Sequence, residues 1–305
     1  MLTVADLTRR ELQVRLRGPG LTLAISPFVV RLQSPIIALT EAIYRLYTDY
    51  ALVGDQEFAD FHLSLEHGSR LRRLMGRGQS LFLFDGTAPF KPLPADQVYP
   101  SFEWGLNWCV ANHCHQYLVL HAAVVERNGR AAILAAPPGS GKSTLCAGLV
   151  NRGWRLFSDE LALIDTVTGE LVAFPRPICL KNASIPVISN FAPEAELGPL
   201  VSETRKGTIA HVRPLRAHVA AASARAMPAW VVLPRFQAGA ETQFRPMAKA
   251  HAGLSLARNA FNFSLLGETG FSALNRAIEA CTAFELDYGD LDAATKLFAE
   301  LADRE

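Results

Sequence analysis

The sequence predicts an α/β protein built from two parts, an N-terminal α+β accessory domain over residues 1–116 and a phosphate-loop domain over residues 117–305. Two observations lead to this prediction. A glycine-rich loop, APPGSGKS at residues 136–143, lies between a short apolar run and a helix-forming segment, the context that a phosphate-binding loop requires. Before it, short apolar or alternating segments are separated by Gly and Pro, which is typical of an antiparallel meander.

The accessory domain is expected to begin with strands and then to alternate helices and strands. Ser34 is a candidate N-cap with Pro35 at the first helical position, where its missing N–H costs nothing. A proline-rich link over residues 89–100 precedes the last helix. We predict, in chain order, strands at 12–16, 21–25 and 28–32, a helix from 35 to about 50, strands at 61–65 and 80–84, and a helix from about 102 to 115.

The phosphate-loop domain is expected to begin with a hairpin, because Asn128-Gly129 is a two-residue turn signal between apolar runs. Gly153 is expected to end the helix that follows the loop. We predict strands at 117–126 and 131–135, a helix at 143–152, a strand at 154–158, short strands from 171 to about 246, helices at about 249–265 and 271–280, a strand at 284–288 and a helix at 291–302.

The loop itself predicts phosphate binding at a helix N-terminus. Backbone N–H groups of such a loop cradle phosphate oxygens, Lys142 reaches the β- and γ-phosphates, and Ser143 can hold Mg²⁺. Ala136 stands where the pattern usually has its first glycine, and an alanine enters that turn if its φ stays negative. The residues expected to bind the nucleotide here are Gly139, Ser140, Gly141, Lys142, Ser143 and Thr144.

An acidic pair, Asp159-Glu160, follows the loop sixteen residues later. We expect it at the carboxyl end of the strand beside the loop, the edge where α/β sheets bind ligands. Phosphoryl transfer often needs a carboxylate that takes the acceptor's proton, so Asp159 is a candidate base or metal ligand, with Glu160 beside it as a candidate metal ligand. The structural alternative is an N-cap with a first-turn acid. We favour the functional interpretation for Asp159, whereas both interpretations stand equally for Glu160.

Several other polar positions indicate a function only through their order in the chain. By themselves, His121 is typical of a satisfied polar group, and the polar segments at residues 175–182, 203–209 and 259–263 are typical of solvated loops. The series formed by His121, the loop, GWRLFSDE, ETRKGTI and FNF resembles the catalytic domain of the bacterial HPr kinase/phosphorylase family over residues 117–290. It is most similar to the branch of HPr-related kinases.

This resemblance implies a homo-oligomeric kinase that uses ATP and Mg²⁺ to phosphorylate serine on a peptide or small protein. Asp159 resembles the catalytic base of the family, Lys142 its phosphate clamp and His121 its active-site histidine. The remaining matches are Ser143 and Glu203 as Mg²⁺ ligands and Arg205 as the basic residue of the signature segment at the nucleotide.

The sequence departs from the family pattern in three places. Glu160 stands where the family usually has a second aspartate, Arg205 is followed by Lys-Gly-Thr instead of Gly-Leu-Gly, and Ala136 replaces the first loop glycine. The resemblance does not extend to residues 1–116, which argues against HPr itself as the acceptor.

Composition limits the class of partner. The chain has 305 residues, 30 basic and 29 acidic side chains and a net charge of +1, so no global charge attracts nucleic acid or a membrane surface. Five scattered cysteines are typical of reduced thiols, and neither a secretory pattern nor a membrane-spanning apolar run is present. We therefore expect a soluble, cytoplasmic protein that binds neither nucleic acid nor membrane.

Two further clusters of polar side chains carry weaker signals. Cys109 and His113 share one helical face near Cys114 and His115, but no second pair completes a four-ligand zinc site, so a half-buried helix end is favoured. A basic cluster of Arg70, Arg72, Arg73 and Arg77 could contact an acidic peptide or RNA, but it lacks interleaved aromatic residues and is typical of a solvated face.

The sequence as a whole predicts a phosphate-loop kinase domain of HPr kinase type with an α+β accessory domain. The predicted activity is ATP- and Mg²⁺-dependent phosphorylation of a serine hydroxyl on a peptide or small protein, with Asp159 as general base. Two alternatives stay open. One is a kinase for free serine or another metabolite, and the other is a nucleotide-dependent binding module that transfers no phosphoryl group.

Overall fold

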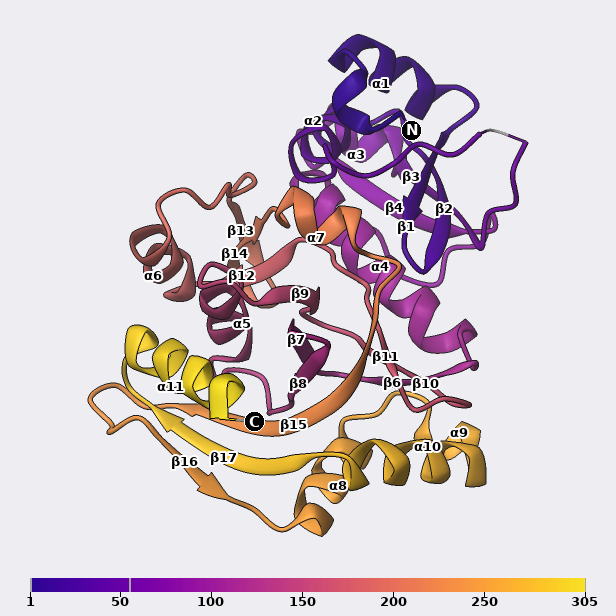
Figure 1. Cartoon of the computed structure of the whole chain (residues 1–305). Helices are drawn as coiled ribbons and strands as arrows, with labels where there is room; N and C mark the ends of the chain where they lie inside the picture. The colour runs from indigo at the N-terminus through magenta and orange to yellow at the C-terminus, as the bar shows by residue number, and fades with distance from the viewer. Residues whose placement is uncertain (1, 55, 305) are drawn as a thin grey trace.

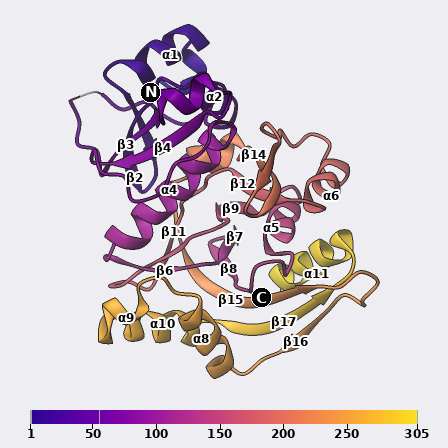
Figure 2. The ribbon, with the colours of Figure 1, turned by 180° about the vertical axis from the view of Figure 1, so that it is seen from behind.

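The computed structural model describes residues 2–54 and 56–304, and the chain forms a mixed α/β protein with three β-sheets (Figure 1). The sheet of residues 21–94 occupies one end of the molecule. The largest sheet crosses the other end, with helices on both of its faces (Figures 1 and 2). The prediction of a mixed α/β protein is confirmed.

The N-terminal sheet has the strand order β1-β2-β3-β4-β5, in which β2 and β3 are parallel and all other neighbours are antiparallel. The four predicted strands from residue 21 to residue 84 are confirmed. The elements of this part are η1 (Val4–Asp6), α1 (Arg9–Arg17), β1 (Leu21–Ile25), β2 (Phe28–Gln33), α2 (Ile37–Leu46), β3 (Phe61–His67), α3 (Arg70–Leu74), β4 (Gln79–Phe84), β5 (Leu93–Pro94), η2 (Ala95–Gln97) and α4 (Val98–His113).

The predicted strand at residues 12–16 is wrong, because these residues belong to helix α1. A capping box begins the helix: the Thr8 hydroxyl accepts a hydrogen bond from the Glu11 N–H, and the Glu11 carboxylate accepts one from the Thr8 N–H. Leu12 and Leu16 are fully buried on one face, whereas Val14 between them is 62% exposed. The alternation of apolar residues therefore concealed a helical period.

Helix α2 begins two residues later than predicted and ends at Leu46. Ser34 is not its N-cap: the Ser34 hydroxyl donates to the Leu65 carbonyl (2.8 Å) and accepts from the Ile36 N–H (3.1 Å). It thus joins the start of the helix to strand β3. Helix α4 begins earlier than predicted, at Val98, and Pro100 lies within its first turn, where proline is tolerated.

The central sheet has the order β6-β10-β11-β15-β8-β7-β9, and β17 and β16 extend it beside β15. Alternate residues of β8 enter different cores: Ala132 and Leu134 pack under helices α5 and α11, whereas Ala131 and Ile133 face α8 and α10. Its strands are β6 (Tyr117–Leu120), β7 (Ala123–Arg127), β8 (Arg130–Leu134), β9 (Arg155–Ser158), β10 (Ala162–Asp165), β11 (Leu171–Val172), β15 (Arg225–Phe236), β16 (Gln243–Pro246) and β17 (Thr282–Tyr288).

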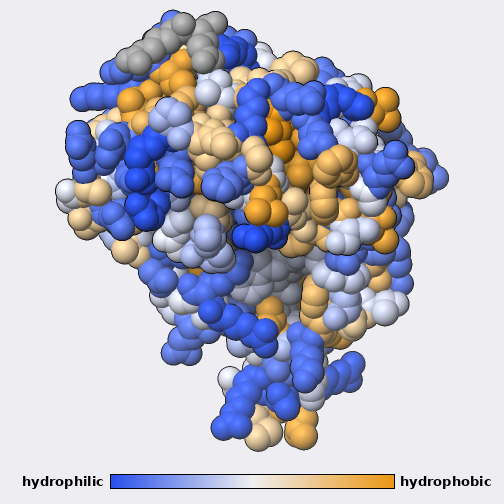
Figure 3. All heavy atoms as spheres, turned by 90° about the horizontal axis from the view of Figure 1, so that it is seen from below, coloured by the Kyte–Doolittle hydropathy of each residue, from blue (hydrophilic) through white to orange (hydrophobic). Residues whose placement is uncertain are grey.

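The remaining elements include a small sheet of order β12-β14-β13, which packs beside α5. Hydrophilic side chains cover much of the face seen from below, and hydrophobic residues gather in small groups among them (Figure 3). These elements are α5 (Lys142–Val150), β12 (Ile178–Lys181), α6 (Ser184–Phe191), β13 (Val201–Thr204), β14 (Gly207–Val212), α7 (Arg216–Ala220), α8 (Lys249–Arg258), α9 (Phe263–Leu266), α10 (Glu268–Glu279) and α11 (Leu291–Arg304).

The predicted strand at 117–126 is two strands, β6 and β7, because the chain breaks at His121. The His121 N–H donates to the Asn259 carbonyl at 2.7 Å instead of to a neighbouring strand of the sheet. The predicted helix at 249–265 is likewise two helices, since the buried Asn262 leaves the helix to bond β6. Its side chain accepts from the Val119 N–H (3.0 Å) and donates to the Tyr117 carbonyl (2.8 Å).

Strand β7 determines how the phosphate loop and the acidic pair meet. The predicted hairpin joins β7 to β8, with Asn128 and Gly129 both at positive φ. The sequence predicts β9 next to β8, but β9 pairs with the other edge of β7. Because β7 is antiparallel to both neighbours, β8 and β9 run in the same direction and their carboxyl ends reach the same edge of the sheet.

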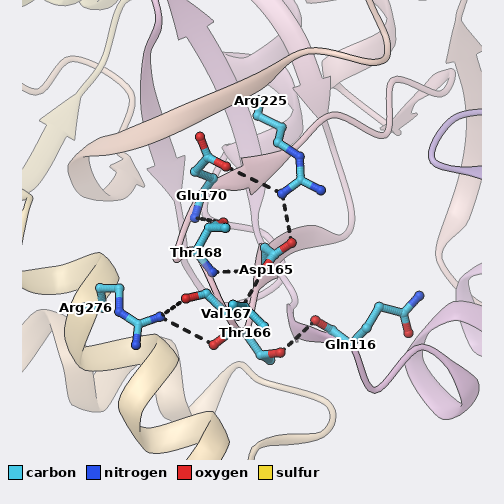
Figure 4. Close-up of polar contacts among 8 residues, drawn as sticks. All are labelled: Gln116, Asp165, Thr166, Val167, Thr168, Glu170, Arg225 and Arg276. Carbon is cyan, nitrogen blue, oxygen red and sulfur yellow. Dashed lines mark hydrogen bonds and ion pairs between the residues drawn. The ribbon is translucent and has the colours of Figure 1, made fainter.

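The turn between β10 and β11 holds helix α10 against the sheet (Figure 4). The Asp165 carboxylate accepts hydrogen bonds from the N–H groups of Val167 (2.9 Å) and Thr168 (3.0 Å), and Arg225 lies 2.8 Å away on β15. Backbone hydrogen bonds, with Arg225, lower the pKa of Asp165 to about 2. Arg276 of α10 donates to the Val167 carbonyl at 2.6 Å.

One hydrophobic core crosses the predicted boundary at residue 116. Phe28 of the N-terminal sheet contacts the rings of Tyr117 (6.2 Å between centroids) and Phe174 (5.3 Å). The same core includes Leu163 and Val172 of the central sheet. The division into two domains stays a prediction. No helix within residues 2–54 and 56–304 is long and apolar enough to span a membrane.

A buried charged cluster also joins the two parts of the chain. Glu103 of α4 accepts hydrogen bonds from the hydroxyls of Tyr47 and Tyr99, each at 2.7 Å, and pairs with Arg176 at 2.9 Å. Arg176 also donates to the Asn107 side chain. Burial raises the pKa of Glu103, although Arg176 and the two hydroxyls act in the opposite direction. Tyr47, Tyr99 and Arg176 all converge on the Glu103 carboxylate, so removal of Glu103 breaks several buried hydrogen bonds at once.

We predict that Glu103→Gln lowers the free energy of unfolding by about 3–5 kcal/mol, because it leaves the buried Arg176 charge without its counter-ion. Urea denaturation measures this change. The matched control is Glu41→Gln, which removes an exposed ion pair with Arg9 and should cost about 0–1 kcal/mol. Equal losses in the two variants would contradict the structural role of the cluster.

Candidate functional site

The phosphate loop connects β8 to α5 and has the backbone that its sequence predicts. Gly139 and Gly141 both have φ +88°, a conformation that side chains other than glycine rarely adopt. Gly141 is the N-cap of α5, and Lys142 and Ser143 form its first turn. Ala136 is buried and does not have a positive φ, so an alanine fits the first position, as predicted. The first N–H groups of α5 are therefore free to face an anion.

The ends of β15 and β17 hold the loop in place. The Tyr288 hydroxyl donates to the Gly141 carbonyl at 2.9 Å, and the Phe236 N–H donates to the Ser140 carbonyl at 3.0 Å. A Cβ atom on Gly141 would lie 2.2 Å from the Tyr288 hydroxyl and 2.9 Å from the Phe236 Cβ. Glycine is thus required at residue 141 both for its φ and for this close contact.

Lys142 lies under the break between β6 and β7. Its ammonium group is within 3.5 Å of the His121 carbonyl, and the residue is only 8% exposed. Burial lowers the pKa of Lys142, while the carboxylates of Asp159 and Glu160 act in the opposite direction. Burial and the Lys142 charge lower the pKa of His121 to about 4, so this imidazole is neutral at pH 7.

Asp159 follows directly after β9 and is almost completely buried. One carboxylate oxygen, Oδ2, accepts a hydrogen bond from the Cys179 N–H at 3.1 Å. The other, Oδ1, is buried and has no hydrogen-bond partner in the described part of the chain. Burial and then the Glu160 charge raise the pKa of Asp159 to about 6, against the opposing effects of Lys142 and the Ser143 hydroxyl.

Glu160 points toward two lysines from the small sheet. Its Oε1 atom lies 3.9 Å from the ammonium groups of Lys181 and Lys206. Burial raises the pKa of Glu160, but Lys206, Lys181 and the other nearby cations outweigh it, so the pKa is lower than usual. The Lys206 ammonium also lies over the Trp104 ring of α4, 5.4 Å from its centroid.

A small cavity of about 20 Å³ lies between the acidic pair and helix α4, large enough for roughly one water molecule. Four charged residues are among its lining residues, namely Asp159, Glu160, Glu103 of α4 and Arg176. The buried His211 also lines the cavity, and burial lowers its pKa to about 3. The accessory part of the chain therefore forms one wall of this cavity.

The structure brings together most of the predicted site residues. Loop residues 139–144 lie beside Asp159 and Glu160, and His121 contacts Lys142 through its carbonyl. Glu203 and Arg205 lie on the exposed β13–β14 hairpin, where Glu203 has φ +55°. Within residues 2–54 and 56–304 no ion pair or side-chain hydrogen bond connects either residue to the loop. Their roles as Mg²⁺ ligand and nucleotide contact stay predictions.

Four site residues were not assigned from the sequence. Lys181 and Lys206 belong to polar segments that were noted, but only the fold shows that both face Glu160. Cys179 contributes a backbone N–H, which no side-chain pattern can indicate. Tyr288 contacts the loop across more than a hundred residues of sequence, and the one available signal is its position as the last residue of a strand.

The site fits a nucleotide with a divalent cation. The buried Asp159 Oδ1 and Ser140 hydroxyl have no partner among the described residues, as expected of atoms that await a ligand. No three His, Cys, Asp or Glu side chains converge on a metal site in those same residues. Mg²⁺ is usually held by one or two carboxylates together with substrate phosphates and water, so such a convergence is not required.

Comparison with known proteins gives partial matches. Residues 105–183 match the family model of ScmC, a SynChlorMet cassette protein, and this stretch contains the loop, α5 and the acidic pair. No curated protein matches the chain. Among solved structures, the HPr(Ser) kinase/phosphatase from Coxiella burnetii is similar, with 9% sequence identity and a TM-score of 0.29. The match covers 61% of this chain and 95% of that one.

We predict that Asp159→Asn stabilises the protein above neutral pH. The folded pKa of Asp159 is about 6 and its unfolded value is lower. The free energy of unfolding therefore falls as pH rises from about 4 to about 6, because the ionised carboxylate is disfavoured in the folded protein. The variant avoids this loss, which amounts to roughly 2–3 kcal/mol for a shift of this size. Urea denaturation at several pH values measures the difference.

The matched control is Asp85→Asn, since Asp85 is exposed and its backbone has φ +47°, which asparagine also adopts readily. The gain for Asp159→Asn should grow between mildly acid and alkaline pH, and the control should show no such growth. A gain that did not change with pH would mean that Asp159 is not held in a desolvated site.

Proposed function

We propose that this protein is an ATP- and Mg²⁺-dependent kinase that phosphorylates a serine hydroxyl on a peptide or small protein. One observation carries the proposal. A buried carboxylate, Asp159, has one unpartnered oxygen and a pKa of about 6, and it lies beside Lys142 and Ser143 of a phosphate-binding loop. A carboxylate raised to this range is suited to accept a proton near neutral pH.

Nucleotide binding would rest on the loop and the first turn of α5. The N–H groups after Gly139 and Gly141 would bind the phosphates, Lys142 would neutralise their charge, and the Ser143 hydroxyl would be a neutral ligand for the cation. When bound, ATP supplies the γ-phosphoryl group and Mg²⁺ screens the charge between the phosphates. Glu160, Glu203 and Arg205 are proposed to complete the cation and nucleotide contacts.

Asp159 is proposed to act as the general base. Its Oδ1 atom takes the proton of the acceptor hydroxyl while the hydroxyl oxygen forms a bond to the γ-phosphorus. The bond between that phosphorus and the bridging oxygen breaks, and ADP leaves with the electron pair. The Cys179 N–H holds Oδ2, which directs Oδ1 toward the acceptor. The backbone carbonyl of His121 is proposed to position the Lys142 ammonium group.

The size of the cavity supports a side-chain hydroxyl as acceptor. Its volume of about 20 Å³ beside Asp159 admits a group of about the size of one water, such as a hydroxyl. The bulk of the acceptor would remain outside, near the exposed hairpin that carries Lys206. A peptide or small protein meets this requirement. Assembly of the chain into a homo-oligomer is proposed from the resemblance alone.

We predict that transfer of labelled γ-phosphate from ATP to acceptor peptides or proteins requires Lys142 and Asp159. Asp159→Asn should lower the rate by about 10²–10⁴-fold, the usual contribution of a general base, and should retain nucleotide binding. Lys142→Met should weaken both nucleotide binding and transfer, because it removes the cation buried at the phosphates. Fluorescent ATP measures the binding and label incorporation measures the transfer.

The matched controls are Asp85→Asn and Lys296→Met, which change exposed residues of the same types. Both should behave as the wild type. Nucleotide binding without label transfer to any macromolecule or metabolite would replace the kinase by a nucleotide-dependent binding module. Transfer to free serine alone would replace the peptide acceptor by a metabolite.

A further inference from the structure

A groove in the N-terminal part of the chain lies apart from the site described above. Its volume is about 480 Å³, within the range of ligand-binding clefts. It is bounded by the end of α1, the end of β2, the open end of β3 and helix α3. We call it the α3 groove, and its lining residues include Arg17, Ser34, Glu66, His67, Arg70 and Arg73.

The charge of the α3 groove is strongly positive. Arg17, Arg70 and Arg73 line it, and Glu66 is the one acidic residue among its described lining residues. None of these three arginines has an ion pair in the part of the chain that the structure describes, in contrast to Arg225 and other surface arginines. His67 also lines the groove, and burial and then the charges of Arg73 and Arg17 lower its pKa.

Helix α3 beside the groove has no packing role of its own. It is five residues long, Arg70–Leu74, and buries none of its residues. Leu71 is 68% exposed, Leu74 85% and the following Met75 61%. So short a helix is marginal without tertiary contacts, and three adjacent exposed apolar side chains are costly in water. Both features are explained if a partner covers this helix.

The end of strand β3 beside the groove has one residue, His67, that no described strand pairs on the β2 side. The ladder between β2 and β3 ends at Ser64, whereas β3 continues to His67. His62 and Gly68 bond toward β4, so alternation directs the N–H and carbonyl groups of Leu65 and His67 to the other side. The Ser34 hydroxyl occupies the Leu65 carbonyl, but no residue of β2 lies opposite His67. This short edge can pair with an extended chain.

We propose that the α3 groove binds an extended acidic polypeptide segment, whose carboxylates pair with Arg17, Arg70 and Arg73 and whose apolar side chains cover Leu71 and Leu74. The edge of β3 at His67 receives the peptide backbone. Arginine forks suit carboxylates because they form two parallel hydrogen bonds. The inference does not depend on the proposed phosphoryl transfer.

A peptide fits the α3 groove better than RNA does. Single-stranded RNA is held mainly by bases stacked on aromatic rings, and no aromatic residue other than His67 is among the described lining residues. The exposed leucines and the open strand edge have no use in RNA binding, whereas both serve an extended peptide. Carboxylates, not phosphates, are therefore the anions that we assign to the three arginines.

The test is fluorescence anisotropy with the full chain and a labelled peptide of about ten residues, rich in glutamate with interspersed leucines. We expect saturable, salt-sensitive binding that the double variant Arg70→Glu and Arg73→Glu weakens at least 10-fold. Neither residue is buried or ion-paired, so the variant should keep the melting temperature of the wild type. Leu71→Ser with Leu74→Ser should weaken binding without any change in net charge of the groove.

The matched control is the double variant Arg258→Glu and Lys296→Glu, which reverses two exposed charges elsewhere and should bind as the wild type does. Asp159→Asn should also bind normally, which separates this inference from the proposed kinase activity. Equal losses in the control, no binding by the wild type, or tighter binding of a single-stranded RNA of matched charge would each overturn the proposal.

Discussion

The arrangement of the site depends on the position of β7 between β8 and β9. This strand is antiparallel to both, so the two strands that end in the phosphate loop and in Asp159 run in one direction. The Asn128-Gly129 turn fixes the first pairing, since both residues have the positive φ that such a hairpin needs. Without β7 the loop and the carboxylate would have no common edge, and the burial of Lys142 and Asp159 side by side would not follow.

Burial of these charges requires compensation, and the site provides it in layers. The charge of Lys142 is opposite to that of Asp159 and offsets it, while the Glu160 carboxylate lies 3.9 Å from the ammonium groups of Lys181 and Lys206. Cations outnumber carboxylates here, which favours anionic phosphates. Behind the cavity, Glu103 and Arg176 and the attached tyrosines form a second buried cluster that fixes α4 against the site. A desolvated carboxylate such as Asp159 lowers stability above neutral pH and gains a basicity useful in catalysis.

Much of this could be predicted from the sequence, because the decisive signals are local. The loop, its helix, the hairpin and the acidic pair are all contained in residues 117–160. The structure has them as expected apart from the break at His121 and the position of β9, which pairs with β7 and not with β8. The rest depends on contacts that are distant in sequence. Helix α1 was mistaken for a strand because Leu12, Val14 and Leu16 alternate while only Leu12 and Leu16 are buried. Lys206 and Tyr288 reach the site through tertiary packing, which no spacing encodes.

The most direct test of the central claim is a crystal structure with Mg²⁺ and a non-hydrolysable ATP analogue. We predict that the β- and γ-phosphates lie against the N–H groups of residues 139–144, with Lys142 in contact with them and the Asp159 Oδ1 atom facing the γ-phosphate across the small cavity. This arrangement would establish that the loop and the acidic pair form one phosphoryl-transfer site. A nucleotide bound elsewhere, or a γ-phosphate that faces away from Asp159, would contradict the account.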